Sequence, residues 1–168
     1  MVEVLGHFID GSLTKSKSGQ TEAVFNPANG EVSAQVHLAS VNEVQAAIAS
    51  SASAFPDWAA TPPAKRTQFL FKLREQLIKN LDDLADILCA EHGKTLQDAK
   101  GELGRGIEVV EFACGISQAL KGEYSENVGM NVDSYTIRQP VGVVAGITPF
   151  NFPAMVPLWM YPVAIACG

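Results

Sequence analysis

An asparagine stands between two prolines at the junction of two apolar segments, in the stretch Thr148-Pro149-Phe150-Asn151-Phe152-Pro153. The prolines restrict the backbone on both sides of Asn151, whose side-chain amide has both donors and an acceptor. An immobilised amide N–H beside a reacting carbonyl can stabilise developing negative charge, and removing one such donor from an enzyme costs roughly 2.7–4 kcal/mol. On the pattern alone Asn151 could equally cap a following helix, because asparagine is a preferred N-cap residue.

A second candidate group is Arg105, which lies between Gly104 and Gly106 in a helical pattern. A guanidinium can bind a carboxylate through two parallel N–H bonds, and the flanking glycines leave space around it. The alternative is a surface arginine paired with Glu102 or Glu108 at helical spacing. We favour carboxylate binding because the glycines add no partner. Lys94 is also cationic, but its place beside a helix end predicts an exposed surface residue.

The elements that would position these groups begin with short alternating runs at residues 6–11, 23–25 and 31–36. The Asp10-Gly11 and Asn29-Gly30 pairs between them predict tight turns, so we expect small antiparallel strands. Four helical patterns follow, at residues 41–55 after a Ser40/Glu43 capping box, at 62–79 with Thr61 as the N-cap, at 80–92 ended by Gly93, and at about 95–119.

After Gly122 the hydrophobic periodicity changes to two, which predicts a half-exposed strand over residues 132–139 with an edge free for pairing. The run Val141–Ile147 has no polar face, so it predicts a buried strand in a sheet covered on both sides. A strand that enters a turn and then a helix is where open α/β sheets bind ligands. The sequence therefore predicts an α/β fold with its site at residues 148–153.

Composition excludes several classes of partner. The 168 residues are 47% apolar, and their net charge of -6 argues against binding to nucleic acid or to anionic lipid. Four prolines interrupt the apolar segment 141–168, so it is a poor membrane span. The first residues lack a targeting pattern, which predicts a cytoplasmic protein. The three cysteines and three histidines lack metal-ligand spacing, so we expect no metal site and treat the cysteines as core residues.

The run from Tyr135 to Pro153, YTIRQPVGVVAGITPFNFP, resembles the aldehyde dehydrogenase superfamily, whose members have R-x-P-x-G-V-x-x-x-I-x-P-W-N-F-P here. Further segments agree with the family in order and approximate spacing, namely Phe8–Gly11, Asn26–Val32, Ala54–Trp58 and Glu91–Thr95. Phe150 in place of the usual tryptophan, and the segment Gly93–Glu111, resemble the methylmalonate-semialdehyde dehydrogenases.

This resemblance implies the N-terminal part of the aldehyde dehydrogenase fold. Residues 1–122 would form a helical and small-strand part of the NAD-binding domain, residues 123–139 a protruding oligomerisation hairpin, and residues 140–168 the start of a Rossmann-like core. The parent enzyme would be a homo-oligomer, a dimer or a tetramer.

The resemblance also implies a reaction. The parent enzyme would oxidise methylmalonate or malonate semialdehyde with NAD and coenzyme A, and release propionyl-CoA or acetyl-CoA, NADH and CO2. Ile147, Thr148, Pro149 and Phe150 would border NAD, and Asn151 would hold the oxyanion of the thiohemiacetal. Arg105 would bind the distal carboxylate of the semialdehyde substrate.

In the family's order the nucleophilic cysteine lies downstream of Gly168, so we expect the 168-residue chain alone to be inactive. The apolar ending at residues 165–168 predicts a piece of a longer dehydrogenase. The alternative is that the chain is itself the product, a non-catalytic binding or assembly partner of a related enzyme. A stop codon directly after Gly168 would favour that alternative.

Overall fold

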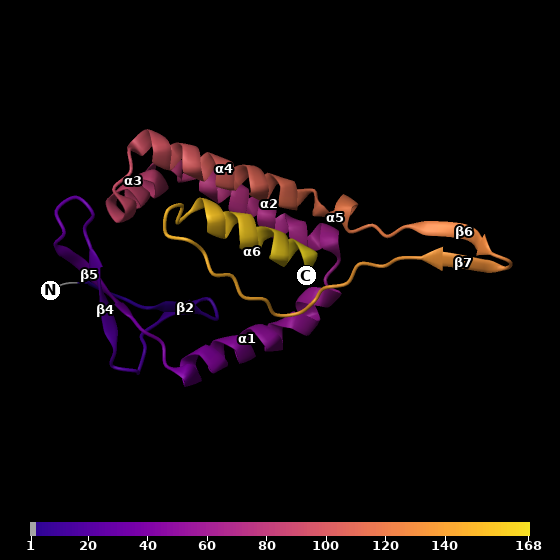
Figure 1. The fold of residues 1–168 in the computed structure, drawn as a ribbon, viewed down its shortest axis with the longest axis horizontal. Coiled ribbons are helices and arrows are strands. Elements are labelled where there is room, and N and C mark those ends of the chain that lie inside the picture. The colour runs from indigo at the N-terminus through magenta and orange to yellow at the C-terminus, as the bar shows by residue number, and fades with distance from the viewer. Residues whose placement is uncertain (1–2) are drawn as a thin grey trace.

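The computed structural model describes residues 3–168, in which small strands near the N-terminus are followed by a layer of helices (Figure 1). The strands are β1 (Glu3–Leu5), β2 (His7–Ile9), β3 (Ser12–Thr14), β4 (Thr21–Phe25), β5 (Val32–His37), β6 (Tyr124–Gly129) and β7 (Val132–Tyr135). The helices are α1 (Val41–Ala60), α2 (Pro63–Lys79), α3 (Leu81–His92), α4 (Leu96–Cys114), α5 (Ile116–Ala119) and α6 (Met155–Cys167). None of these helices is long and apolar enough to cross a membrane.

The N-terminal strands confirm the turns predicted from sequence. β2 and β3 form an antiparallel hairpin around Asp10 and Gly11, which have φ values of 51° and 71°. Both central residues of a type I′ turn need positive φ, which Asp-Gly tolerates. β5 pairs with β4 on one side, antiparallel through the Asn29-Gly30 turn, and with β1 on the other, in parallel.

Helix α1 begins with the predicted capping box, in which Ser40 Oγ accepts from the Glu43 N–H and the Glu43 carboxylate accepts from the Ser40 N–H. It continues to Ala60, beyond the predicted end at residue 55, with Pro56 inside. A proline leaves the carbonyl four residues earlier without its helical donor. That residue is Ala52, which is exposed, so water can satisfy the carbonyl and the helix persists.

The extension of α1 changes the role of Thr61. Its hydroxyl donates to the Asp57 carbonyl and ends α1, and α2 begins after Pro62 without a side-chain cap. The predicted N-cap of α2 at Thr61 is therefore wrong, because Thr61 is the C-cap of α1. The predicted end of α3 is confirmed, since Gly93 adopts the left-handed conformation at φ 78°.

The core lies where α4 packs against α6, α2 and α3. One cluster joins α2, α4, α5 and α6, and a second joins α3 and α4. Gly106 allows α4 and α6 to approach closely, because an added Cβ would lie 2.5 Å from Leu158 Cδ1. The single helix predicted for residues 95–119 is interrupted at Gly115, which separates α4 from α5.

Arg66 joins the C-terminal ends of α1 and α6. Its side chain is buried and donates to the carbonyls of Thr61 at 2.7 Å and Ala166 at 3.0 Å, with longer bonds to those of Cys167, Ala59 and Trp58. Helix C-termini carry partial negative charge and unpaired carbonyls, which a guanidinium can satisfy together.

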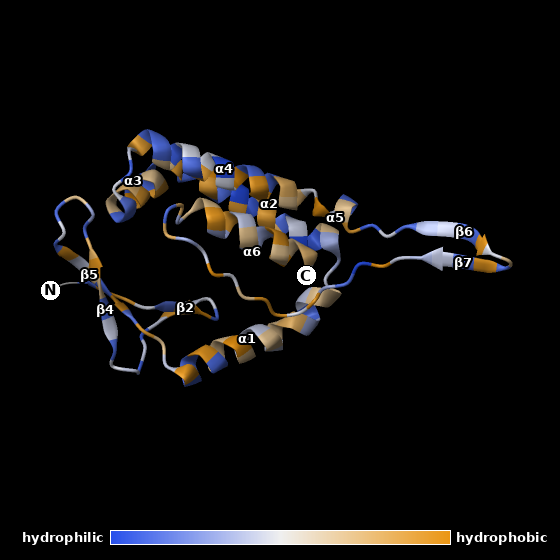
Figure 2. Cartoon of the chain, in the orientation of Figure 1, coloured by the Kyte–Doolittle hydropathy of each residue, from blue (hydrophilic) through white to orange (hydrophobic). Residues whose placement is uncertain are grey.

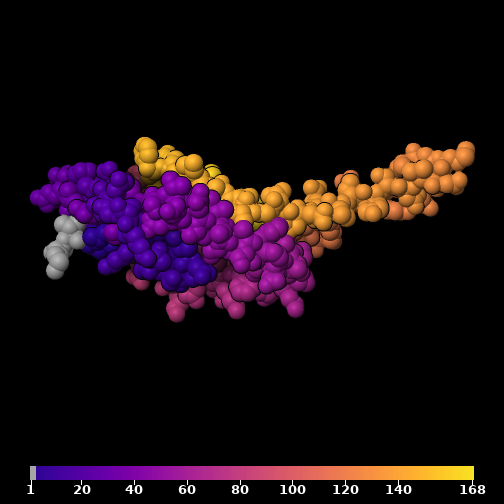
Figure 3. Space-filling model, turned by 90° about the horizontal axis from the view of Figure 1, so that it is seen from below, coloured from indigo at the N-terminus to yellow at the C-terminus, as the bar shows by residue number. Residues whose placement is uncertain are grey.

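Strands β6 and β7 form an antiparallel hairpin within the predicted span 123–139. Figure 3 shows it as a narrow arm that projects from the rest of the molecule. Every residue of both strands is exposed, including Val132 and Tyr135. The hairpin therefore has apolar side chains and unpaired strand edges in solvent.

The predicted buried strand at Val141–Ile147 is wrong for the residues described. These residues run as an extended segment between α1 and α6 and pair with no other strand of residues 3–168 (Figure 1). Val141 is 90% exposed and Ile147 is 94% exposed. A strand is buried only when neighbouring strands and covering layers exist. Within residues 3–168 no strand pairs with this segment, although β2 and α1 border a cavity together with Val143 and Val144. Figure 2 shows the hydrophobic colour of the segment and of α6.

Candidate functional site

The predicted site residues Ile147, Thr148, Pro149, Phe150 and Asn151 lie together on the surface, where the extended segment turns into α6. The Phe150 ring is 90% exposed. Helix α6 begins at Met155, four residues after Asn151, and the N–H groups of Met155 and Val156 are already bonded, to Glu102 and to the Phe152 carbonyl. The predicted order of turn and helix is observed, but the segment before the turn is extended and exposed rather than a buried strand.

The N-terminus of α6 is capped from another helix. Glu102, on the buried face of α4, accepts from the backbone N–H groups of Ala154 at 2.8 Å and Met155 at 3.0 Å. A carboxylate at a helix N-terminus satisfies unpaired donors and complements the helix dipole. Glu102 thus ties the turn before α6 to α4.

Lys94 lies beside this carboxylate and forms an ion pair with it. Its ammonium also donates to the Asn151 carbonyl at 3.4 Å and lies 4.8 Å from the centre of the Phe152 ring. The Lys94 side chain is 9% exposed, so the predicted surface role is wrong. The lysine is drawn inward because Glu102 needs a counter-charge in the interior.

Burial and hydrogen bonding oppose each other at Glu102. Desolvation raises the pKa of the Glu102 carboxyl, but hydrogen bonds from Lys94 and from the N–H groups of Met155 and Ala154 lower it more. The pKa is therefore below its ordinary value, and the carboxylate is ionised when it caps α6.

The Asn151 side chain caps nothing. The N-cap of α6 is Ala154, and within residues 3–168 the Asn151 amide makes no hydrogen bond. The helix-capping alternative is therefore wrong, because Glu102 has taken that role. The Asn151 side chain is left with two N–H donors and an acceptor that other molecules can use.

Arg105 lies on the exposed face of α4 and borders a cavity of about 700 Å³. The other residues around this cavity are His92, Lys94, Gln97, Asp98, Gly101, Glu102, Phe152 and Met155. In the described chain Arg105 forms no ion pair, and Glu102 is paired with Lys94 instead. The alternative of a pair with Glu102 or Glu108 is therefore not observed, and the guanidinium can bind an external anion.

A different cavity, of about 530 Å³, lies on the Thr148 side of the turn. Its walls come from the extended segment and α6, and its members are Val144, Ala145, Gly146, Thr148, Pro157, Met160, Tyr161, Ala164 and Ile165. Burial raises the pKa of the Tyr161 phenol, so it stays protonated near neutral pH. The cavity is a mostly apolar space with two hydroxyl groups.

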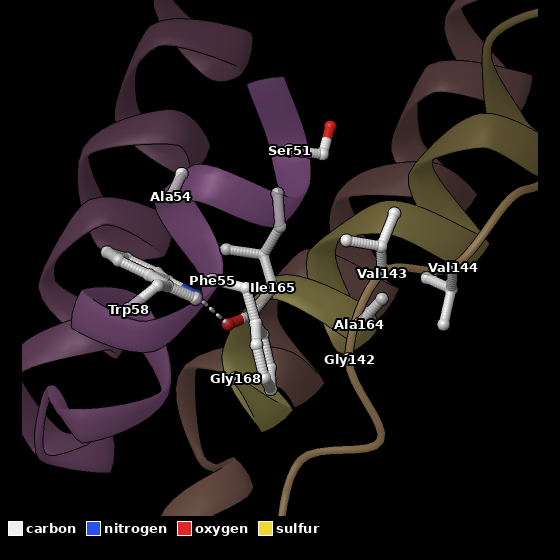
Figure 4. Close-up of a pocket in the computed structure, with 10 residues that line it drawn as sticks. All are labelled: Ser51, Ala54, Phe55, Trp58, Gly142, Val143, Val144, Ala164, Ile165 and Gly168. Carbon is white, nitrogen blue, oxygen red and sulfur yellow. Dashed lines mark hydrogen bonds between the residues drawn. The ribbon is translucent and has the colours of Figure 1, made fainter. Parts of the chain in front are cut away.

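A third cavity, of about 290 Å³, separates α1 from α6 (Figure 4). The indole N–H of Trp58 donates to the Ile165 carbonyl at 2.9 Å across one side of it. Ser51 is the one hydroxyl residue around it, and no acid or base borders it. This space can accept apolar groups but offers no group for acid–base chemistry.

The cysteines lie away from the Arg105 cavity. Cys114 and Cys167 pack in the cluster joining α2 to the C-terminal half of α6, and Cys89 packs in the α3–α4 cluster. Desolvation raises the pKa of the Cys114 thiol, which disfavours the nucleophilic thiolate. Within the described range no three His, Cys, Asp or Glu side chains are placed to hold a metal ion.

Sequence reasoning missed the Lys94–Glu102 pair. A signal was present in the α4 pattern, because Glu102 shares a face with Ala99, Leu103 and Gly106 and all four are buried. A carboxylate on a buried helix face requires a partner. The sequence contains the requirement but does not identify Lys94 and the α6 N–H groups as the partners.

Comparison with known proteins agrees with the family resemblance. Residues 13–168 match the model of the aldehyde dehydrogenase family. The chain is 54% identical over 164 residues to a malonate-semialdehyde dehydrogenase of Pseudomonas aeruginosa, covering 98% of the chain and 33% of that protein. It is 48% identical to the mitochondrial acylating methylmalonate-semialdehyde dehydrogenase of Arabidopsis thaliana, covering 96% of the chain and 27% of that protein.

Solved structures agree as well. A methylmalonate-semialdehyde dehydrogenase of Oceanimonas doudoroffii superposes with a TM-score of 0.95 at 51% identity over 99% of the chain and 34% of that protein. A Sinorhizobium meliloti protein assigned to the same activity and solved with NAD superposes with a TM-score of 0.96 at 50% identity, over 100% of the chain and 34% of that protein. The chain thus spans about a third of the length of the relatives it matches.

Proposed function

Since the chain belongs to the aldehyde dehydrogenase family, we propose that it forms part of an NAD-dependent, CoA-acylating dehydrogenase of malonate or methylmalonate semialdehyde. In this proposal the chain supplies the oxyanion donor, the substrate-carboxylate site and one edge of the NAD site. The released products are acetyl-CoA or propionyl-CoA, NADH and CO2. The named activities of the similar proteins support the substrate class.

The single observation that carries the proposal is the unpartnered Asn151 amide. Because Glu102 caps α6, the Asn151 N–H groups are free to donate to an oxygen that gains negative charge at the aldehyde carbon. Asn151 is exposed rather than in the core, and its neighbour Phe152 borders the Arg105 cavity. In the proposed reaction Asn151 stabilises the oxyanion formed when a thiolate attacks the aldehyde.

Arg105 supplies the specificity for a carboxylated aldehyde. Its guanidinium borders the cavity that Phe152 also borders, one residue from Asn151. The other cation at this cavity, Lys94, is neutralised by Glu102. A carboxylate at one end of a short semialdehyde can pair with Arg105 while the aldehyde at the other end lies near Asn151.

The residues around Thr148 fit one edge of a dinucleotide. The Phe150 ring offers exposed flat surface, and Thr148 places a hydroxyl at the rim of an otherwise mostly apolar cavity. Bound NAD supplies the hydride acceptor for the oxidation. Ile147, Thr148, Pro149 and Phe150 would hold its ribose and nicotinamide side, and coenzyme A would accept the acyl group.

The nucleophile and the oligomer complete the proposal. No cysteine of residues 3–168 borders the Arg105 cavity, so the attacking thiolate is proposed to come from outside this segment. The exposed hairpin β6–β7 is proposed to pair with another copy in a homo-oligomer, since its strand edges are unpaired.

Replacing Arg105 tests the substrate class. In the full-length enzyme Arg105→Leu removes a charged, bidentate contact worth roughly 1.5–3 kcal/mol, so KM for malonate semialdehyde should rise about 10- to 100-fold. Propanal has no carboxylate, and its KM should change less than about twofold. Arg74→Leu, which removes a surface pair with Glu111, is the matched control. Equal effects of Arg105→Leu on both aldehydes would contradict the carboxylate role.

A further inference from the structure

Two charged side chains lie inside the protein directly beneath the turn that bears Asn151. Lys94 follows α3 and Glu102 lies on α4, and their side chains are 9% and 1% exposed. Neither is assigned a part in the proposed chemistry. Moving both charges out of water carries a desolvation penalty. Their mutual attraction and their further hydrogen bonds must offset that penalty in the folded protein.

The contacts of Glu102 connect α4 to the start of α6. One carboxylate oxygen accepts from both the Ala154 and the Met155 N–H groups, and the other accepts from Lys94. A neutral cap, such as serine, would satisfy these donors from the turn itself. Glu102 does so from a separate helix, so the turn is held relative to α4, which also bears Arg105.

The contacts of Lys94 extend this connection to Asn151. Its ammonium donates to the Asn151 carbonyl and lies over the Phe152 ring while paired with Glu102. The peptide carbonyl of Asn151 is held on one side, and the N–H groups of the residues three and four positions later are held on the other. These contacts restrain the backbone that carries the Asn151 amide.

We propose that Lys94 and Glu102 are positioning residues. Their buried ion pair fixes the position of the Asn151 amide relative to Arg105 on α4. The catalytic part of this inference rests on the proposed function, because Asn151 acts on a reacting aldehyde only there. Lys94 does not bind the substrate carboxylate, since Glu102 has neutralised it. A displacement of about 1 Å at a reacting centre can cost about 100-fold in rate.

The kinetic pattern separates a positioning pair from a substrate contact. In the full-length enzyme Lys94→Met should lower kcat about tenfold or more for malonate semialdehyde and for propanal alike, with each KM within about threefold. Lys94→Arg keeps the cation and should recover most of kcat. Lys100→Met removes the exposed ion pair between Lys100 on α4 and Asp82 on α3, and its kcat should stay within about twofold of the wild-type value. A loss confined to the carboxylated substrate, or an unchanged kcat, would overturn the proposal.

Amide hydrogen exchange on the 168-residue chain tests the geometry without any enzyme activity. Glu102→Gln should speed exchange at the Ala154 and Met155 amides about tenfold or more, and Lys100→Met should leave both within about twofold. If Glu102→Gln unfolds the chain, Glu102→Asp is the test instead. It keeps the negative charge near Lys94, but its side chain is one methylene shorter. Unchanged exchange at both amides in the folded Glu102 variant would overturn the inference.

These two experiments also separate failure of the inference from failure of the proposed function. A full-length protein that oxidises neither aldehyde would contradict the proposed function. The exchange rates at residues 154 and 155 would still establish or refute the anchoring of the turn by Glu102.

Discussion

Replacing Arg66 with methionine should destabilise the chain strongly, because one buried side chain satisfies carbonyls at the ends of two helices. Arg66 is 3% exposed, and its guanidinium has no carboxylate partner among its hydrogen bonds. Methionine fills similar space but has no donor. The carbonyls of Thr61 and Ala166, which have the shortest bonds to Arg66, would be left unpaired.

The size of the effect follows from these bonds. A hydrogen bond to a charged group contributes roughly 1.5–3 kcal/mol, so the two shortest bonds give about 3–6 kcal/mol. Removing the guanidinium also removes the cost of burying it, which offsets part of that sum. We therefore expect a net loss of about 3 kcal/mol, and a fall in Tm of about 6–12 °C for a chain of this length.

Thermal and urea unfolding of wild type, Arg66→Met and Arg74→Met would measure this loss. Arg74 pairs with Glu111 at the surface, where its side chain is 37% exposed, so its replacement should cost at most about 1 kcal/mol. If Arg66→Met costs no more than Arg74→Met, the claim that Arg66 holds α1 and α6 together is refuted.

Two further predictions concern pH and packing. Backbone hydrogen bonds from Ser40 and Lys17 lower the pKa of Glu43 to about 2 from 4.5, so its stabilising effect is complete above pH 4.5 and is lost as the pH falls toward 2. Glu43→Gln should flatten that acid dependence of Tm, and parallel curves for both proteins would contradict it. Gly106→Ala should cost about 1–3 kcal/mol in urea unfolding because its Cβ would meet Leu158, whereas Gly101→Ala, with open space, should stabilise α4 by about 0.5–1 kcal/mol. A change in unfolding free energy of the same sign for the two variants would refute the packing argument.

Features that depend on nearby residues were predicted from the sequence. The Asp10-Gly11 turn, the Ser40 capping box and the left-handed Gly93 each follow from local conformational preferences. Thr61 was assigned to the wrong helix because its role depends on whether α1 persists past Pro56. The sequence pattern of each helix alone does not show which of the two helices Thr61 will cap.

Features that depend on distant residues were predicted only in part. The run 141–147 has the composition of a buried strand, but a strand exists only with hydrogen-bonded partners, and no strand of residues 3–168 pairs with it. The turn containing Asn151 was located correctly. The role of Glu102 could not be predicted because its N–H donors lie 52 and 53 positions away. The burial of Lys94 follows from that contact, so it was missed as well.

The most direct test of the central claim is NADH formation by the full-length enzyme from malonate semialdehyde, with and without coenzyme A, in wild type and Asn151→Ala. We predict CoA-dependent NADH formation by the wild type, and a kcat lower by about 100- to 1,000-fold in Asn151→Ala, the usual effect of removing one oxyanion donor. The isolated 168-residue chain should form no NADH. A full rate for Asn151→Ala, or turnover by the isolated chain, would contradict the account.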